Sequence, residues 1–125
     1  MRVVIVKPEK IAYEKEIGDS LESMQQVVGG FIEAIYPFED QEVALVCNEE
    51  GKIKGLPLNR ALYSPDNKKQ IIDIVAGTFF VCAAPSNSGN FESLTFEQVI
   101  KYLNRFHDPE GFYRKSDNTI GVFYY

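Results

Sequence analysis

Two apolar runs in the chain predict the central strands of a sheet. Residues 3–6 contain only valine and isoleucine, and Pro8 closes the segment. A continuous apolar run of this length is typical of a strand that is covered on both faces. The segment Thr78–Ala84 has the same character, and we expect it to be a central strand.

Two other segments show the apolar spacing of amphipathic helices. In residues 21–28 the apolar side chains recur every three or four positions, and Gly29 follows the segment. Glycine accepts the left-handed conformation that commonly ends a helix, so we expect this helix to stop there. The second helix is predicted over residues 96–106, because Thr95 and Gln98 form the T-x-x-Q pattern of a capping box.

The polar segment Asn48–Lys52 predicts a hairpin turn. It follows the apolar strand 43–47, and Gly51 occupies its last turn position, where we expect a positive φ angle. The return strand is predicted over residues 52–54, and Pro57 then interrupts pairing.

The remaining segments are assigned from their composition and alternation. Strands are predicted over residues 31–36 and 119–125, a strand or a short amphipathic turn over 70–75, a helical turn or an ordered loop over 58–63, and irregular structure over 9–18.

The order of these elements favours the α+β class, with two helices on a mostly antiparallel sheet of about five strands. A doubly wound parallel sheet would need more crossover helices than the pattern offers. The chain has 125 residues, which suits one domain over residues 1–125, since domains typically contain about 100–150 residues. No apolar run approaches the roughly 18 residues of a membrane span, and no signal peptide is evident, so we expect a cytoplasmic protein.

Charge is distributed unevenly along the chain. The formal net charge is −5, and residues 1–50 hold 11 acidic and four basic side chains. This balance argues against direct binding of nucleic acid, which requires a basic face. The acidic segment with Glu39, Asp40 and Glu42 could instead contact a basic partner or mimic nucleic acid, although a solvated acidic surface is the simpler and favoured interpretation.

The reactive side chains do not form a catalytic or metal-binding pattern. Cys47 and Cys82 lie in apolar segments, His107 is the single histidine, and no CxxC motif is present. Buried thiols have raised pKa values and are poor nucleophiles. We therefore predict no catalytic residue, no metal site and no cofactor.

Three polar residues are candidates for a ligand pocket, namely Asn48, Asn59 and Arg60. An ordered guanidinium can bind a carboxylate or phosphate through two hydrogen bonds. The alternative is structural, with Asn59 capping a short helical turn and Arg60 pairing with an acid. At the C-terminus, Tyr124 and Tyr125 either contact a partner or complete the sheet, and an unpaired final strand could form a homodimer.

Three segments of the chain resemble a known family. They are VGGFIE at residues 28–33, LVCNEEGKIKGLPLNRA at residues 45–61 and VAGTFFV at residues 75–81. Together they resemble domain of unknown function family 3846, found in proteins of bacteriophages and conjugative elements, over about residues 1–84. The resemblance implies a small α+β domain in a mobile element and no established activity.

Two functions remain open from the sequence. The first is a small soluble binding module of a mobile element that contacts a protein partner, with an antirestriction-like role as a special case. The alternative is a small-ligand binder or enzyme with a polar pocket near Asn48, Asn59 and Arg60.

Overall fold

The computed structural model describes all 125 residues and has a five-stranded antiparallel sheet at its centre. In spatial order the strands are β2 (Tyr13–Glu16), β1 (Arg2–Val6), β7 (Phe79–Ala83), β4 (Val43–Asn48) and β3 (Ile32–Ile35). The predicted α+β class is therefore confirmed. The two apolar runs form adjacent strands near the middle of the sheet, as their composition indicated.

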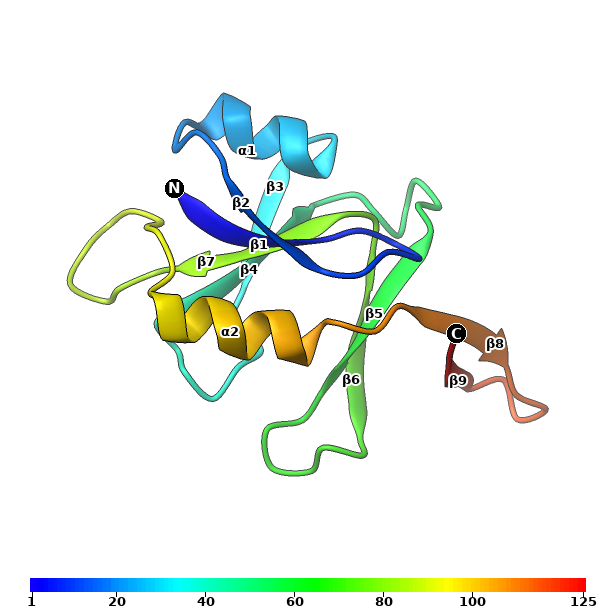
Figure 1. Cartoon of the computed structure of the whole chain (residues 1–125). Helices are drawn as coiled ribbons and strands as arrows, with labels where there is room; N and C mark the ends of the chain where they lie inside the picture. The colour runs from blue at the N-terminus through cyan, green and yellow to red at the C-terminus, as the bar shows by residue number, and fades with distance from the viewer.

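Each face of this sheet is covered by one helix, α1 (Leu21–Val28) or α2 (Phe96–Arg105) (Figure 1). Val3 and Ile5 of β1 pack with Met24 of α1, whereas Val4 and Val6 join the cluster around α2. The sheet is buried on both faces because its central strands carry apolar side chains in both directions. Neither helix has the length and apolar character that crossing a membrane requires.

Local helix signals are confirmed at the residues that the sequence indicated. Gly29 has φ 77° and donates its N–H to the carbonyl of Gln25, which ends α1. At the start of α2, Thr95 and Gln98 exchange the two hydrogen bonds of a capping box. These signals depend only on neighbouring residues, so they can be identified without knowledge of the fold.

The segment expected to be a helical turn or loop is instead a strand, β5 (Leu58–Tyr63). It pairs with β6 (Ile71–Ala76) in an antiparallel hairpin that extends away from the main sheet (Figure 1). Leu62 and Val75 of this hairpin pack into the cluster on the α2 face. The sequence pattern does not indicate this strand, because Asn59 and Arg60 interrupt its apolar residues. In the structure both side chains are completely buried.

The predicted return strand at residues 52–54 is also wrong. Successive turns follow β4, with Lys54 N–H bonded to the Glu50 carbonyl and Leu56 N–H bonded to the Gly51 carbonyl. The positive φ angle belongs to Gly55, at 67°, and not to Gly51. Gly51 is required for a different reason, because a Cβ there would lie 2.6 Å from the Ala76 carbonyl oxygen.

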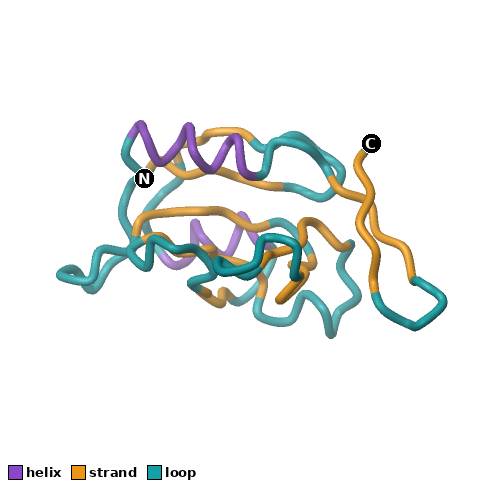
Figure 2. Tube along the Cα trace, turned by 90° about the horizontal axis from the view of Figure 1, so that it is seen from below, coloured by secondary structure: helices purple, strands orange, loops and turns teal.

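The C-terminal segment forms a second hairpin, β8 (Glu110–Arg114) with β9 (Ile120–Tyr124). Figures 1 and 2 show it at one end of the molecule, beside the body that contains the main sheet. Strand β9 was expected within residues 119–125, but its partner β8 was not. Strand β2 likewise lies within residues 9–18, which were expected to be irregular. Its charged residues are exposed at the sheet edge, so they lack the alternation that marks a strand.

Candidate functional site

Asn48 joins the end of β4 to the end of α1. Its Nδ2 donates to the Val28 carbonyl at 3.2 Å, and its Oδ1 accepts the Glu50 N–H at 2.8 Å. The side chain is buried, and it borders a surface hollow near the turn that follows β4. Both ends of the amide are therefore used to fix the backbone around it.

Asn59 occupies the interior between β5 and the main sheet. Its Nδ2 donates to the Val6 carbonyl at 2.8 Å and to the Gly77 carbonyl at 2.9 Å. The side chain has no exposed surface. It satisfies two carbonyl groups from segments far apart in the sequence, which is the role of an interior cross-link.

Arg60 is the largest of the fully buried side chains. Its Nη2 donates to the carbonyls of Lys10 at 2.7 Å and Phe106 at 2.9 Å, and Nη1 donates to Asn59 Oδ1 at 3.0 Å. Burial lowers the pKa of the guanidinium, and the nearby carboxylate of Glu110 opposes that effect. No exposed surface remains for a ligand, so we assign Arg60 and Asn59 structural roles.

Glu110 is a buried acid whose carboxyl group is influenced by the positive charge of Arg60. Its Oε1 accepts the Ala61 N–H at 3.0 Å, which links β8 to β5. Burial raises the pKa of this carboxyl, while the Ala61 hydrogen bond and the charges of Arg60 and Arg105 act in the opposite direction. The native state therefore binds this proton more readily than the unfolded chain does.

A Glu110→Gln variant is expected to change the pH dependence of stability. At low pH the proton bound to Glu110 stabilises the native state relative to the unfolded chain. This stabilisation is lost as the pH rises above the ordinary pKa of 4.5 and through the higher pKa of the native state. Glutamine still offers an oxygen to Ala61 but cannot titrate. Urea denaturation between about pH 4.5 and 7 should show wild-type stability declining relative to the variant. A constant difference across that range would contradict the raised pKa.

The cysteines and the histidine do not form a nucleophilic centre. Burial raises the pKa of Cys47 to about 11 and that of Cys82 to about 12, so both remain thiols at neutral pH. His107 is exposed and its Nδ1 lies 2.8 Å from Asp108 Oδ1. Nowhere does the structure gather three or more His, Cys, Asp or Glu side chains in an arrangement suited to a metal ion.

The acidic loop before β4 is largely bonded to the chain itself. Glu42 Oε1 accepts from the N–H and the hydroxyl of Ser86 at 3.0 and 2.9 Å, and these bonds lower its pKa. Asp40 Oδ1 accepts the Glu42 N–H at 2.9 Å. Glu39 lies beside a hollow that contains several basic side chains. The loop is thus ordered by its own hydrogen bonds, while Glu39 and Glu42 remain exposed at the surface.

Aromatic rings cover one face of the β8–β9 hairpin. Tyr113, Phe123 and Tyr125 have exposed fractions of 50%, 44% and 71%. The ring centroids are 6.3 Å apart for Tyr113 and Phe123, and 5.6 Å apart for Phe123 and Tyr125. We refer to these three residues as the aromatic face.

Two glycines make room for the aromatic face. A Cβ at Gly111 would lie 2.1 Å from the Phe123 ring, and one at Gly121 would lie 2.2 Å from the Tyr113 ring. The rings therefore lie flat across the hairpin. Tyr125 was a candidate partner residue from the sequence and belongs to this face. Tyr124, the other candidate, is also exposed but alternates to the opposite face.

In the two-stranded sheet of β8 and β9 each strand has one edge that pairs with no other strand, and the register decides which groups of β9 face outward. Lys115 N–H donates to the Thr119 carbonyl at 2.8 Å, and Tyr113 pairs with Gly121 further along. Since bonded and non-bonded pairs alternate in an antiparallel ladder, the peptide groups of Val122 and its alternate neighbours point outward. The aromatic face therefore borders an unpaired strand edge.

Comparison with known proteins places most of the chain in one family. The family model described as "Domain of unknown function (DUF3846)" matches residues 1–107, which include the main sheet, the β5–β6 hairpin and both helices. No curated protein and no solved structure matches the chain. The resemblance seen in the sequence over residues 1–84 is confirmed and extends through α2, while the aromatic hairpin lies beyond the match. The chain belongs to the DUF3846 family, a family of unknown function.

Proposed function

We propose that this chain is a non-catalytic binding module of a bacterial mobile element, acting in the cytoplasm on a protein partner. The observation that carries the proposal is the aromatic face, in which three neighbouring rings remain exposed on a terminal hairpin. The mobile-element setting rests on the resemblance in sequence.

Exposed aromatic rings of this kind are typical of protein interfaces. Tyrosine and phenylalanine bury a large area at a small cost in side-chain entropy, and they dominate the residues that matter most for binding. Contiguous apolar patches on a monomer are commonly functional. The polar residues first considered for a ligand pocket, Asn59 and Arg60, are enclosed and already bonded, which also favours a surface function.

The partner that fits best is an extended protein segment. Such a segment can add a strand to β9 by bonding to its outward peptide groups, while its side chains pack on the aromatic face. This mode accounts for the two features together, since either an apolar patch or a free edge alone would suit many partners. A second copy of this chain is a competing occupant that the test must distinguish.

Mimicry of nucleic acid, the antirestriction-like form of the hypothesis, is favoured less. The carboxylates of Glu14 and Glu16 lie 3.1 and 3.7 Å from Arg2 Nε, so their charges are partly neutralised. Glu42 is bonded to Ser86. A mimic of a phosphate backbone needs a regular row of unpaired negative charges, and these acids do not provide one.

A photo-crosslinking amino acid at position 123 tests the proposal in host cells. We expect a specific protein adduct at this position and none at Phe96, which is 71% exposed on α2 and serves as the matched control. Val122→Pro should abolish the adduct because it removes an outward N–H, whereas Val122→Ala should retain it. The contact should persist at about 0.5 M salt, where exposed ionic contacts are screened.

Three results would contradict the proposal: no adduct at position 123, equal adducts at positions 123 and 96, or an adduct insensitive to Val122→Pro. An adduct to a second copy of the chain would show that the aromatic face forms a homodimer and does not bind a different protein. Thermal unfolding of each variant checks that the fold is retained.

A further inference from the structure

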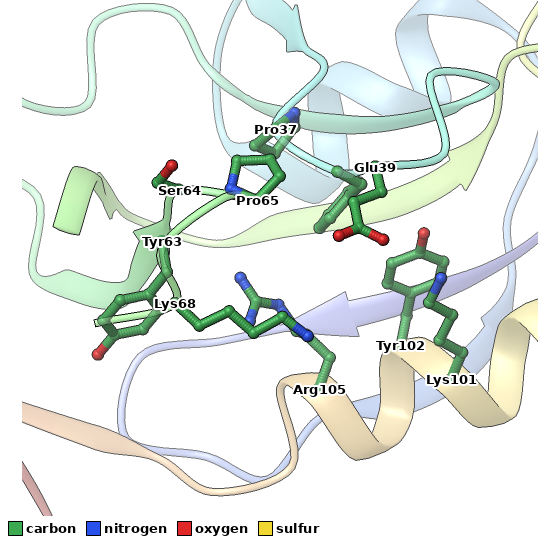
Figure 3. Close-up of a pocket in the computed structure, with 10 residues that line it drawn as sticks. Pro37, Glu39, Tyr63, Ser64, Pro65, Lys68, Lys101, Tyr102 and Arg105 are labelled. Atoms are coloured by element: carbon green, nitrogen blue, oxygen red, sulfur yellow. The ribbon is translucent and has the colours of Figure 1, made fainter. Parts of the chain in front are cut away.

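A hollow of about 200 Å³ lies between α2 and the loops that precede β4 and follow β5. Figure 3 shows Lys101, Tyr102 and Arg105 rising from α2, with Glu39 facing them from the opposite loop. Lys68 reaches toward the same space from the loop after β5. Three basic groups and one acidic group thus surround the hollow, in a chain whose net charge is −5.

Tyr102 carries an unsatisfied donor at this hollow. Its side chain is 1% exposed, and its ring packs on Phe38 with a centroid distance of 4.7 Å. The hydroxyl is the single buried side-chain polar atom in the structure with no hydrogen-bond partner. Buried polar groups are almost always satisfied, so an unpaired one beside a hollow indicates an acceptor supplied from outside.

The charge state of Tyr102 makes it a donor. Burial raises the pKa of its phenol to about 12, and the negative charge of Asp40 acts in the same direction. The hydroxyl therefore keeps its proton at neutral pH and can donate to an oxygen atom that enters the hollow. An oxyanion is the natural acceptor, because the hollow is also lined by the cationic side chains of Lys68, Lys101 and Arg105.

Two of the three basic groups around the hollow contact aromatic rings, and their donors are not used. The Arg105 guanidinium carbon lies 5.9 Å from the Tyr63 ring and 5.5 Å from the Phe106 ring, which are cation–π distances. Lys101 Nζ lies 5.5 Å from the Tyr102 ring. Neither side chain forms an ion pair in the structure, and Lys68 also forms none.

We propose that this hollow binds the phosphate group of a small phosphorylated molecule. Tyr102 donates a hydrogen bond to one phosphate oxygen, and Arg105 contacts two oxygens through its planar fork. Lys101 and Lys68 balance the remaining charge from opposite sides. Three cations suit a phosphate dianion better than a carboxylate, which carries one charge.

Glu39 gives the site its selectivity. As the one acid that lines the hollow, it repels a bare phosphate ion but can accept a hydrogen bond from a hydroxyl on the same ligand. The volume is below the roughly 300–1,000 Å³ of pockets for drug-sized molecules, so the ligand is small. Glycerol phosphate, with a phosphate and two hydroxyls, is the appropriate probe beside inorganic phosphate.

Calorimetric titration at constant ionic strength tests the site with inorganic phosphate, glycerol phosphate and acetate. We expect saturable binding of glycerol phosphate, weakened about tenfold or more by Arg105→Gln, since hydrogen bonds to charged groups are the strong ones. Arg114→Gln, the same change on the exposed hairpin, should leave affinity unchanged. Glu39→Gln should strengthen inorganic phosphate binding several-fold and reduce the preference for glycerol phosphate, since the amide oxygen accepts a weaker hydrogen bond than the carboxylate.

Tyr102→Phe provides a readout that is independent of ligand affinity. Removing an unpaired buried hydroxyl should raise the Tm of the unliganded protein, whereas losing a satisfied hydroxyl would lower it. The same variant should weaken glycerol phosphate about fivefold or more. A fall in Tm would show that the hydroxyl is already satisfied and would contradict the inference.

Two further results would overturn the proposal: no saturable binding of either phosphate by the wild type, or equal effects of Arg105→Gln and Arg114→Gln. Acetate binding as tightly as phosphate would reject a phosphate group as the ligand. Val122→Pro, which disrupts the edge of the hairpin, should leave phosphate binding unchanged, so this site and the protein-binding function can fail separately.

Discussion

Replacing Arg60 by leucine is expected to lower the free energy of unfolding by about 3–5 kcal/mol, because buried carbonyl groups lose their donor at about 1–3 kcal/mol each. The change removes the donors that satisfy the carbonyls of Phe106 and Lys10, and it leaves Arg105 as the remaining positive charge that acts on the buried Glu110. Phe106 is the C-cap of α2, so Arg60 also lies at the negative end of the helix dipole.

Urea denaturation measures this loss, with Arg114→Leu on the exposed hairpin as the matched control. Arg60→Lys should recover only part of the stability, because one ammonium group cannot reach the carbonyls in the positions of the guanidinium fork. A domain of this size has about 5–15 kcal/mol of stability, so the leucine variant should still be measurable. A loss below about 1 kcal/mol would show that leucine packing compensates for the lost hydrogen bonds.

The parts of the fold that the sequence predicts are those determined by neighbouring residues. The apolar run at residues 3–6 indicates a strand covered on both faces, and the structure places it between both helices. Gly29 and the Thr95–Gln98 pair mark helix ends through contacts within a few positions. These signals need no information about the rest of the chain.

Strand β5 could not be predicted in this way. Its polar residues are buried because they bond to carbonyls at Val6, Lys10 and Phe106, between 46 and 53 positions away in the chain. From composition alone, a polar pair inside an apolar segment indicates a turn or a surface. Only the assembled fold shows that interior carbonyl groups need these donors.

The hollow lined by Tyr102 could not be predicted either, because its residues come from separate segments that only the fold brings together. Lys68 comes from the loop after β5, Lys101 and Arg105 come from α2, and Glu39 comes from the loop before β4. Lys101 and Arg105 are four positions apart on one helix face, but no spacing in the sequence relates them to Lys68 or Glu39. The hairpin that carries the aromatic face does have a local signal in the sequence, the turn-forming residues Ser116–Asn118. In the structure Asn118 adopts a positive φ angle of 69° in this short loop.

Asn59→Leu is expected to cost about 2–4 kcal/mol, although leucine has the same branched skeleton of heavy atoms as asparagine. The cost arises because two buried carbonyls, at Val6 and Gly77, lose their donor, and each unsatisfied group costs about 1–3 kcal/mol. Arg60 also loses the side-chain oxygen that its Nη1 contacts at 3.0 Å. The effect should therefore exceed what side-chain volume predicts.

Urea denaturation of Asn59→Leu should be compared with Asn90→Leu, the same substitution in an exposed loop, which should change stability by about 0.5 kcal/mol or less. The double variant with Arg60→Leu should lose less than the sum of the single losses, because both residues belong to one hydrogen-bond network. Additive losses would mean that the two side chains support the interior separately. A near-neutral Asn59→Leu would mean that water reaches the Val6 and Gly77 carbonyls, and the interior between β5 and the main sheet would then be open to solvent.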